Sequence, residues 1–120
     1  MINYGKQSID EKDIKAVTDT LNSDWLTQGP KVEEFEQALA DYCGAKYAVA
    51  VCSGAAVLHL TNLVIGTDIT INVVTTSFTF LSTSNSVIYA GGTPVFAGIC
   101  DDSFNIDIRK TTNLSNWRKS

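Results

Sequence analysis

The sequence predicts an α/β fold with a mainly parallel sheet, and three observations support that prediction. Short apolar segments alternate with longer segments whose apolar residues recur every three or four positions, as strands and helices do in parallel α/β folds. Residues 47–51 are apolar on both faces and lie between turn formers, which is typical of a strand buried in a parallel sheet. A turn of small residues, Ser53-Gly54-Ala55-Ala56, follows directly and opens the next helical segment.

Size and charge restrict the class of protein. A chain of 120 residues with 44% hydrophobic content suffices for one folded unit with a modest core. The formal net charge is −4 and the nine Lys and Arg residues are scattered, so no basic stripe is available for nucleic acid. No apolar run approaches the ~18 residues of a membrane span, and no secretory leader opens the chain. We therefore expect a cytoplasmic protein whose partners include neither nucleic acid nor a membrane.

The spacing of apolar residues places four helices and three strands along the chain. The predicted helices are Asp10–Leu21, Val32–Tyr42, Ala55–Val64 and Leu81–Ala90, and the predicted strands are Tyr47–Val51, Ile69–Thr76 and Pro94–Ile99. Ser8 or Asp10 could cap the first helix, and Gly44 and the Gly91-Gly92 pair are expected to end the second and fourth. Residues 47–51 should form a central strand of the sheet.

The cysteines and the single histidine give weak functional signals. Cys43, Cys52 and Cys100 form no C-x-x-C pair, so we expect reduced thiols and no metal site. Cys52 has a second interpretation as a reactive thiol, because a helix beginning beside it could lower the pKa of its side chain. His59 is interpreted as structural.

The Ser53–Ala56 turn is the strongest candidate for a ligand site on local chemistry. Gly54 allows a ligand to approach the backbone closely, and the free N–H groups at the start of a helix favour an anion such as phosphate. The alternative is a tight strand-to-helix turn that is simply packed with small side chains.

Several short blocks along the chain carry a resemblance to a known family. They are Tyr4-Gly5-Lys6-Gln7, Ser23–Pro30, Phe35-Glu36, Tyr42–Lys46, Ala48–Val51, Ser53-Gly54, Leu58-His59, Thr75–Phe80, Asn85 and Pro94-Val95-Phe96. In this order they resemble the DegT/DnrJ/EryC1/StrS family of pyridoxal-phosphate sugar aminotransferases, from residue 4 to about residue 107. The first two blocks are most similar to the branch that serves pseudaminic acid synthesis. That branch aminates C4 of a UDP-linked 4-keto-6-deoxy-N-acetylhexosamine, with glutamate as amino donor.

The resemblance implies the type I fold of pyridoxal-phosphate (PLP) enzymes. The large domain of that fold is a three-layer sandwich with a mainly parallel sheet, here incomplete. Residues 1–30 then form an N-terminal arm, a helix and a substrate loop, and residues 31–107 form a partial PLP-binding large domain. Residues 108–120 do not resemble the family, and their polar, non-periodic sequence predicts disorder. Members of the family are homodimers, which makes a second copy the expected partner.

The resemblance also assigns candidate site residues. Backbone N–H groups around Gly54, Ala55 and Ala56 would hold the cofactor phosphate, and Phe80 would stack on the pyridine ring. The alternative for Phe80 is an ordinary core aromatic. The residues that would line the nucleotide-sugar pocket are Tyr4, Asp24, Trp25, Leu26, Thr27, Gly54 and Asn85. For Tyr4 and Trp25 the alternative is hydrophobic anchoring of the N-terminal arm.

Some positions depart from the family pattern. Ala55 replaces the usual threonine, which removes a hydroxyl contact to the phosphate, and Gly98 stands where an acid is expected. Thr70-Ile71-Asn72 replaces an acidic glycine turn.

No lysine of the chain lies in the context of the family's Schiff-base lysine, which is expected beyond residue 120 together with the aspartate that pairs with the pyridine nitrogen. We therefore assign no catalytic residue and expect an N-terminal fragment that is inactive alone. The alternatives are a non-catalytic remnant that binds a nucleotide sugar or a protein, and a fragment of a related sugar dehydratase.

Overall fold

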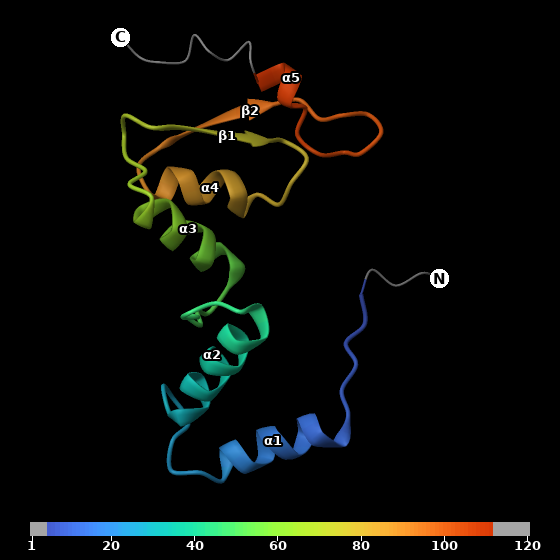
Figure 1. The fold of residues 1–120 in the computed structure, drawn as a ribbon, viewed down its shortest axis with the longest axis vertical. Coiled ribbons are helices and arrows are strands. Elements are labelled where there is room, and N and C mark those ends of the chain that lie inside the picture. Colours follow the sequence, from blue (N-terminus) through green and yellow to red (C-terminus); the bar gives the residue numbers. More distant parts are fainter. Residues whose placement is uncertain (1–4, 112–120) are drawn as a thin grey trace. The chain divides into compact units, whose positions relative to one another are not determined.

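A computed structural model describes residues 5–111 of the protein. The chain divides into two compact units, with the boundary between Ala50 and Val51, and each unit is described by itself. In its described residues the first unit contains helices and no strand, whereas the second alternates helices and strands (Figure 1). The predicted α/β fold is therefore confirmed, and its sheet lies in the second unit.

The first unit begins with α1 (Glu11–Leu21), whose start is fixed by a capping box. The Asp10 carboxylate accepts hydrogen bonds from the N–H groups of Lys12 at 2.8 Å and Asp13 at 3.1 Å. The Asp13 carboxylate in turn accepts from the Asp10 N–H at 2.9 Å. Each side chain satisfies an N–H that the helix itself leaves free, so Asp10 is the cap and Ser8 is not.

The second helix, α2 (Pro30–Cys43), has the ends that its sequence predicts. Pro30 occupies the first turn, where its missing N–H costs no hydrogen bond. Gly44 ends the helix in the left-handed conformation with φ of 64°, which side chains rarely adopt. Within these two helices only Ala40 is buried.

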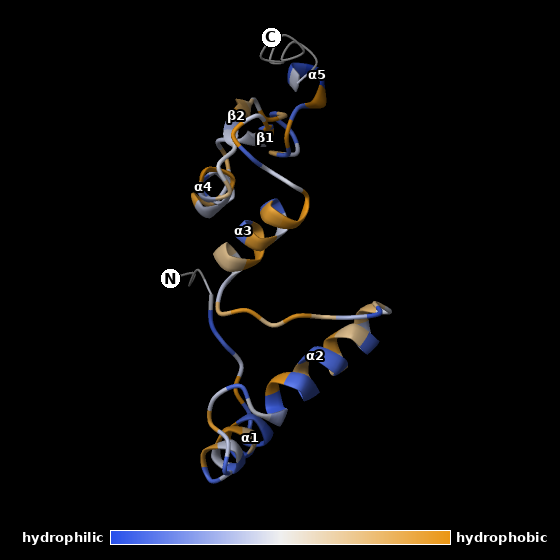
Figure 2. Ribbon diagram, turned by 90° about the vertical axis from the view of Figure 1, so that its left-hand side faces the viewer, coloured by the Kyte–Doolittle hydropathy of each residue, from blue (hydrophilic) through white to orange (hydrophobic). Residues whose placement is uncertain are grey.

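Residues 47–51 do not form the central strand that was predicted. They pair with no strand within residues 5–111, and Tyr47 and Val49 are 75% and 76% exposed. The Ala50 N–H donates a hydrogen bond to Glu36 Oε1 at 2.7 Å. The apolar composition, visible as the orange stretch between α2 and α3 in Figure 2, correctly indicates an extended segment. A strand also needs a neighbour, and the two described strands pair with each other instead.

The second unit contains the α/β part of the chain. Its elements are α3 (Gly54–Val64), β1 (Asn72–Thr76), α4 (Ser82–Tyr89), β2 (Thr93–Ala97) and α5 (Ile108–Thr111). The strands β1 and β2 pair in parallel through the crossover helix α4, as expected for a β-α-β unit. Helix α4 contacts both strands and α3 packs against α4. Figure 1 shows α4 running alongside the two strands.

Strand β1 starts three residues later than the predicted Ile69–Thr76. Asp68 is the cause, because its Oδ1 accepts hydrogen bonds from the Thr70 N–H at 2.8 Å and the Thr70 hydroxyl at 2.6 Å. The Ile71 N–H closes the same turn on the Asp68 carbonyl at 3.0 Å. A side-chain hydrogen bond of this kind competes with strand pairing.

The core of the second unit is small and mainly polar. Its buried apolar residues are Val87 and Ala97, at 2% and 7% exposure. Its buried polar residues are Asn62, Thr67, Thr75, Ser84, Ser86 and Asp107. Hydrogen bonds must therefore specify much of the packing that apolar contacts specify in most domains.

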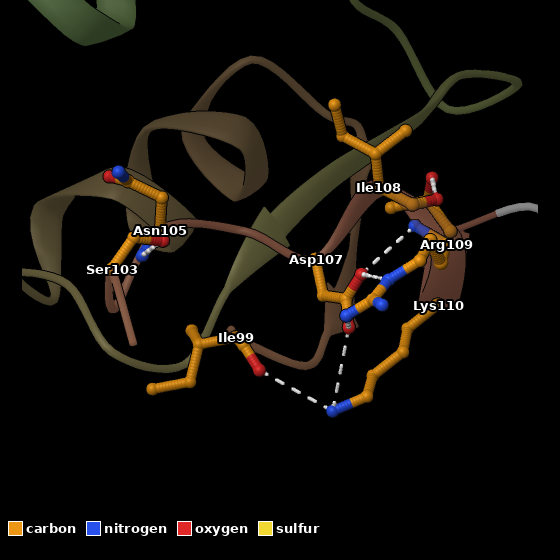
Figure 3. A network of polar contacts seen from close by, with 8 residues as sticks. Ile99, Ser103, Asn105, Asp107, Ile108, Arg109 and Lys110 are labelled. Carbon is orange, nitrogen blue, oxygen red and sulfur yellow. Dashed lines mark hydrogen bonds and ion pairs between the residues drawn. The ribbon is translucent and has the colours of Figure 1, made fainter. Parts of the chain in front are cut away.

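The chain after β2 closes on itself through Asp107, as Figure 3 shows. Ile99 forms an antiparallel bridge with Ile106, so β2 is shorter than the predicted Pro94–Ile99. The Asp107 side chain is 4% exposed and accepts from Arg109 Nε at 3.0 Å and Nη2 at 3.1 Å. Lys110 Nζ lies 3.7 Å from the same carboxylate.

These contacts correct the prediction of a disordered tail for residues 108–111, which form α5. Asp107 accepts from the Arg109 N–H at 3.0 Å, so its carboxylate caps α5 as well as pairing with the guanidinium. The rest of the predicted tail, residues 112–120, lies outside the described residues.

We expect Asp107 to make stability depend on pH in the acid range. The hydrogen bond from Arg109 lowers the pKa of Asp107 below its ordinary value of 3.8. A carboxyl group with a lowered folded pKa stabilises the fold at neutral pH, and this contribution is lost as pH falls from about 3.8 through the folded value. Asp107→Asn should therefore lower the urea midpoint of unfolding at pH 7, and the difference from the wild type should narrow at pH 3. The exposed neighbour Asp102→Asn is the control, and an equal loss in both variants at pH 7 would contradict the assignment.

Candidate functional site

The predicted phosphate turn is the first turn of α3. Ser53 caps this helix, and its Oγ accepts a hydrogen bond from the Ala56 N–H at 3.2 Å. The Ala56 N–H is therefore already engaged, which leaves the N–H groups of Gly54 and Ala55 as the donors without an acceptor inside the helix. Sequence reasoning missed the role of Ser53, although a serine directly before a helical segment is a recognised capping signal.

Gly54 and Ala55 are exposed, so the turn is not packed in the way that the alternative interpretation required. A Cβ atom placed on Gly54 would meet no atom within 4 Å. The space beside the Gly54 Cα, at the first turn, is therefore free of atoms from the described residues, and a phosphate oxygen could approach the backbone there. This geometry fits the phosphate group of a cofactor such as PLP.

Phe80 and Asn85 lie in the same unit as the turn. Phe80 lies between β1 and α4 and is 80% exposed, so its interpretation as a core aromatic is wrong for this structure. Asn85 lies on α4 and is half-buried. The chain between β1 and α4 leaves the carboxyl end of a parallel strand, which is where α/β folds bind their ligands. The exposed ring of Phe80 is thus available to a ligand at that edge.

The predicted substrate loop lies in the first unit. Asp24, Trp25, Leu26 and Thr27 are all exposed in the segment between α1 and α2. A Cβ atom on Gly29 would lie 2.6 Å from Trp25 Cβ, so the tight turn requires glycine at this position. Trp25 is 63% exposed, so residues 5–111 do not bury its side chain as an anchor. Tyr4 lies outside the described residues.

Leu26 also lines a hollow of about 380 Å³ on the side of α1. The other lining residues are Ala16, Val17, Thr20 and Leu21, so the walls are mainly apolar. Of the substrate-loop residues, Leu26 thus shares a surface with α1. The candidate cofactor residues Gly54, Ala55, Ala56 and Phe80 belong to the second unit together with Asn85.

The remaining candidates have structural surroundings. The His59 ring lies edge-on to the Tyr89 ring, with 5.8 Å between centroids, and so joins α3 to α4. Cys43 and Cys52 are exposed, Cys100 is half-buried, and all three are free thiols. Within residues 5–111 no three His, Cys, Asp or Glu side chains are placed to hold a metal ion. No helix in the same part of the chain has the length and apolar character to cross a membrane.

Comparison with known proteins decides the family. The sequence pattern of the DegT/DnrJ/EryC1/StrS aminotransferase family matches residues 7–118, a range that includes residues 108–118, which were expected to lie outside the resemblance. The chain belongs to this family. Spore coat polysaccharide biosynthesis protein SpsC of Bacillus subtilis is 45% identical to this chain over 104 residues, which cover 87% of this chain and 27% of SpsC.

A second relative is the UDP-4-amino-4,6-dideoxy-N-acetyl-beta-L-altrosamine transaminase of Campylobacter jejuni. It is 43% identical over 110 residues, which cover 92% of this chain and 29% of the transaminase. The chain thus spans less than a third of the length of these two relatives.

Solved structures agree with the family assignment. PseC of Helicobacter pylori, an aminotransferase involved in the biosynthesis of pseudoaminic acid, matches with a TM-score of 0.85 and 36% identity over 98% of this chain and 32% of PseC. Spr1654 of Streptococcus pneumoniae, in its PMP-form, matches with a TM-score of 0.86 and 30% identity. That match covers 93% of this chain and 28% of Spr1654. The fold of the described residues is therefore part of an aminotransferase fold of the DegT/DnrJ/EryC1/StrS family.

Proposed function

We propose that this chain is part of a PLP-dependent nucleotide-sugar aminotransferase. The substrate would be a UDP-4-keto-6-deoxy-N-acetylhexosamine, aminated at C4, with glutamate as the amino donor. The observation that carries this proposal is the family match over residues 7–118, which includes the open first turn of α3. The similarity to a transaminase that forms a 4-amino-4,6-dideoxy sugar nucleotide supports the choice of substrate class.

The residues of the second unit would bind and orient the cofactor. PLP supplies the electron sink that allows an amino group to pass between an amino acid and a keto sugar. The N–H groups of Gly54 and Ala55 would donate to the phosphate, and the partial positive charge of the helix start would stabilise it. Ser53 would hold the turn in shape through Ala56, and the Phe80 ring would cover one face of the pyridine and exclude water from it. No lysine of this chain is assigned to the amino transfer.

The substrate side of the proposal rests on other residues. Tyr4, the loop Asp24–Thr27 and Asn85 would contact the sugar nucleotide. The exposed Trp25 ring would offer a flat apolar surface to the base or the sugar. A homodimer and a cytoplasmic location remain predictions.

A titration with PLP tests the proposal, and Ala55→Thr sharpens it. We expect saturable binding that inorganic phosphate competes with. Ala55→Thr should tighten PLP binding, because the added hydroxyl can donate a hydrogen bond to the phosphate. Such a bond contributes about 1–3 kcal/mol, or roughly a five- to hundred-fold gain in affinity. The absorption spectrum of PLP reports binding.

Val57→Thr is the matched control, because it adds the same hydroxyl beyond the first donors of the helix, where the Val57 N–H bonds to the Ser53 carbonyl. PLP binding that does not saturate, or that phosphate leaves unchanged, would overturn the proposed cofactor role and favour a binding module without PLP. An Ala55→Thr effect no larger than that of Val57→Thr would place the phosphate elsewhere.

A further inference from the structure

A closed set of hydrogen bonds joins three buried side chains between α3 and α4. These are Asn62, Thr67 and Ser86, called here the amide cluster, with exposures of 8%, 5% and 1%. Asn62 Nδ2 donates to Ser86 Oγ at 3.2 Å and to the Leu58 carbonyl at 2.9 Å. Asn62 Oδ1 accepts from Thr67 Oγ1 at 3.1 Å. One amide thereby connects α3, α4 and the loop that leads to β1.

The amide cluster is satisfied in only one orientation. Ser86 Oγ donates to the Thr83 carbonyl at 2.9 Å, so its hydrogen is committed and its lone pair is left for the Asn62 amide. Rotating the amide by 180° would turn Asn62 Oδ1 toward the Leu58 carbonyl oxygen and lose both donated bonds. Because an unpaired buried polar group costs about 1–3 kcal/mol, the cluster selects one register of α3 on α4.

Apolar packing contributes little to that register. Val87 is the buried apolar residue of these two helices, whereas Val57, Leu60 and Leu63 on α3 are 49%, 46% and 48% exposed. Half-exposed side chains interlock weakly, so they allow small shifts of one helix on the other. The Asn62–Ser86 hydrogen bond has the directionality that these contacts lack.

The register matters because each helix begins at a candidate cofactor contact. Helix α3 starts with the free donors of Gly54 and Ala55, and α4 starts two residues after Phe80. We propose that Asn62 is a positioning residue for the cofactor, which through Ser86 sets the distance between the phosphate donors and the Phe80 ring. This inference rests on the proposed function. Asn62 itself lies about two turns from Gly54 along α3.

Loss of the Asn62–Ser86 hydrogen bond would lower the fraction of molecules in which the α3 phosphate donors and the Phe80 ring are correctly spaced for PLP. The affinity for a ligand that uses both contacts falls by that fraction. A hydrogen bond of typical strength corresponds to about a two- to ten-fold loss. Inorganic phosphate uses the turn alone, so its affinity should not change.

The test compares two ligands across a mutant cycle of the full chain. The variants are Asn62→Leu, Ser86→Ala and the double substitution, with PLP and inorganic phosphate each titrated by ¹H–¹⁵N NMR shifts of Gly54 and Ala55. We expect PLP to bind each variant about two- to ten-fold more weakly, phosphate to bind unchanged, and the double variant to match Asn62→Leu. Thr61→Val is the matched control, because within residues 5–111 Thr61 Oγ1 bonds only back to the Val57 carbonyl of its own helix, at 2.8 Å.

The outcomes separate this inference from the proposed function. Unchanged PLP affinity in Asn62→Leu and Ser86→Ala, with saturable binding by the wild type, overturns the positioning role alone. Absence of saturable PLP binding by the wild type overturns both. If phosphate and PLP affinity fall in parallel, Asn62 has a merely structural role. If Asn62→Leu unfolds, the smaller substitution Ser86→Ala decides whether the Asn62–Ser86 hydrogen bond positions the cofactor contacts.

Discussion

Gly54→Ala is expected to weaken PLP binding without destabilising the fold. Gly54 is the first residue of α3, its φ lies outside the left-handed region, and an added Cβ meets no atom within 4 Å. Alanine should therefore fit, and it should raise stability slightly, by about 0.4–1 kcal/mol, because it restricts the unfolded chain. The new methyl group would occupy the open space in front of the first-turn donors and hold a phosphate away from them.

Loss of one charge-assisted hydrogen bond corresponds to about 1.5–3 kcal/mol, or roughly ten- to a hundred-fold in affinity. The measurement pairs a PLP titration with a thermal melt. Gly66→Ala is the matched control, since its Cβ also meets open space but its φ of 80° strains any side chain. That variant should lose about 1–2 kcal/mol of stability and keep its phosphate affinity. If Gly54→Ala binds PLP as the wild type does, the phosphate does not approach this turn.

Val87→Asp is expected to unfold the second unit. Val87 is 2% exposed on α4, and a Cβ on Gly92 would already lie 3.0 Å from its Cγ1, so the site has no room for water. An unpaired carboxylate there costs about 3–5 kcal/mol, a large part of the 5–15 kcal/mol that stabilises a typical domain. Amide exchange of the β1–β2 pairs should lose its protection.

The adjacent Ile88→Asp is the control, because Ile88 is 55% exposed and its replacement leaves the same charge in water. We expect its urea midpoint to stay close to the wild-type value. Equal midpoints for Val87→Asp and the wild type would mean that α4 does not depend on the contact between Val87 and its neighbours.

The helices could be predicted from sequence because their signals are local. Asp10 was one of the two candidate caps of α1, and Gly44 and the Gly91-Gly92 pair were expected to end α2 and α4. The turn at Gly54 was predicted for the same reason, since its small residues directly precede an apolar helix.

Features that depend on a distant neighbour could not be predicted in this way. Residues 47–51 have the composition of a buried strand, but a strand is defined by pairing, which a single segment does not encode. The exposure of Phe80 and the partners of Asn62 likewise depend on which elements pack together. Asn62 is the one buried residue of α3, and its bonds to Leu58, Thr67 and Ser86 explain why an amide is tolerated there.

The polar character of the second unit's core has a thermal consequence. Unfolding raises the heat capacity through newly hydrated apolar groups, whereas newly hydrated polar groups lower it. A unit whose buried side chains are mainly Asn, Thr, Ser and Asp releases little apolar surface. Its heat-capacity increment should therefore lie below the usual ~12–15 cal/mol/K per residue, and its free energy of unfolding should vary with temperature along a flatter curve than that of an apolar-cored domain.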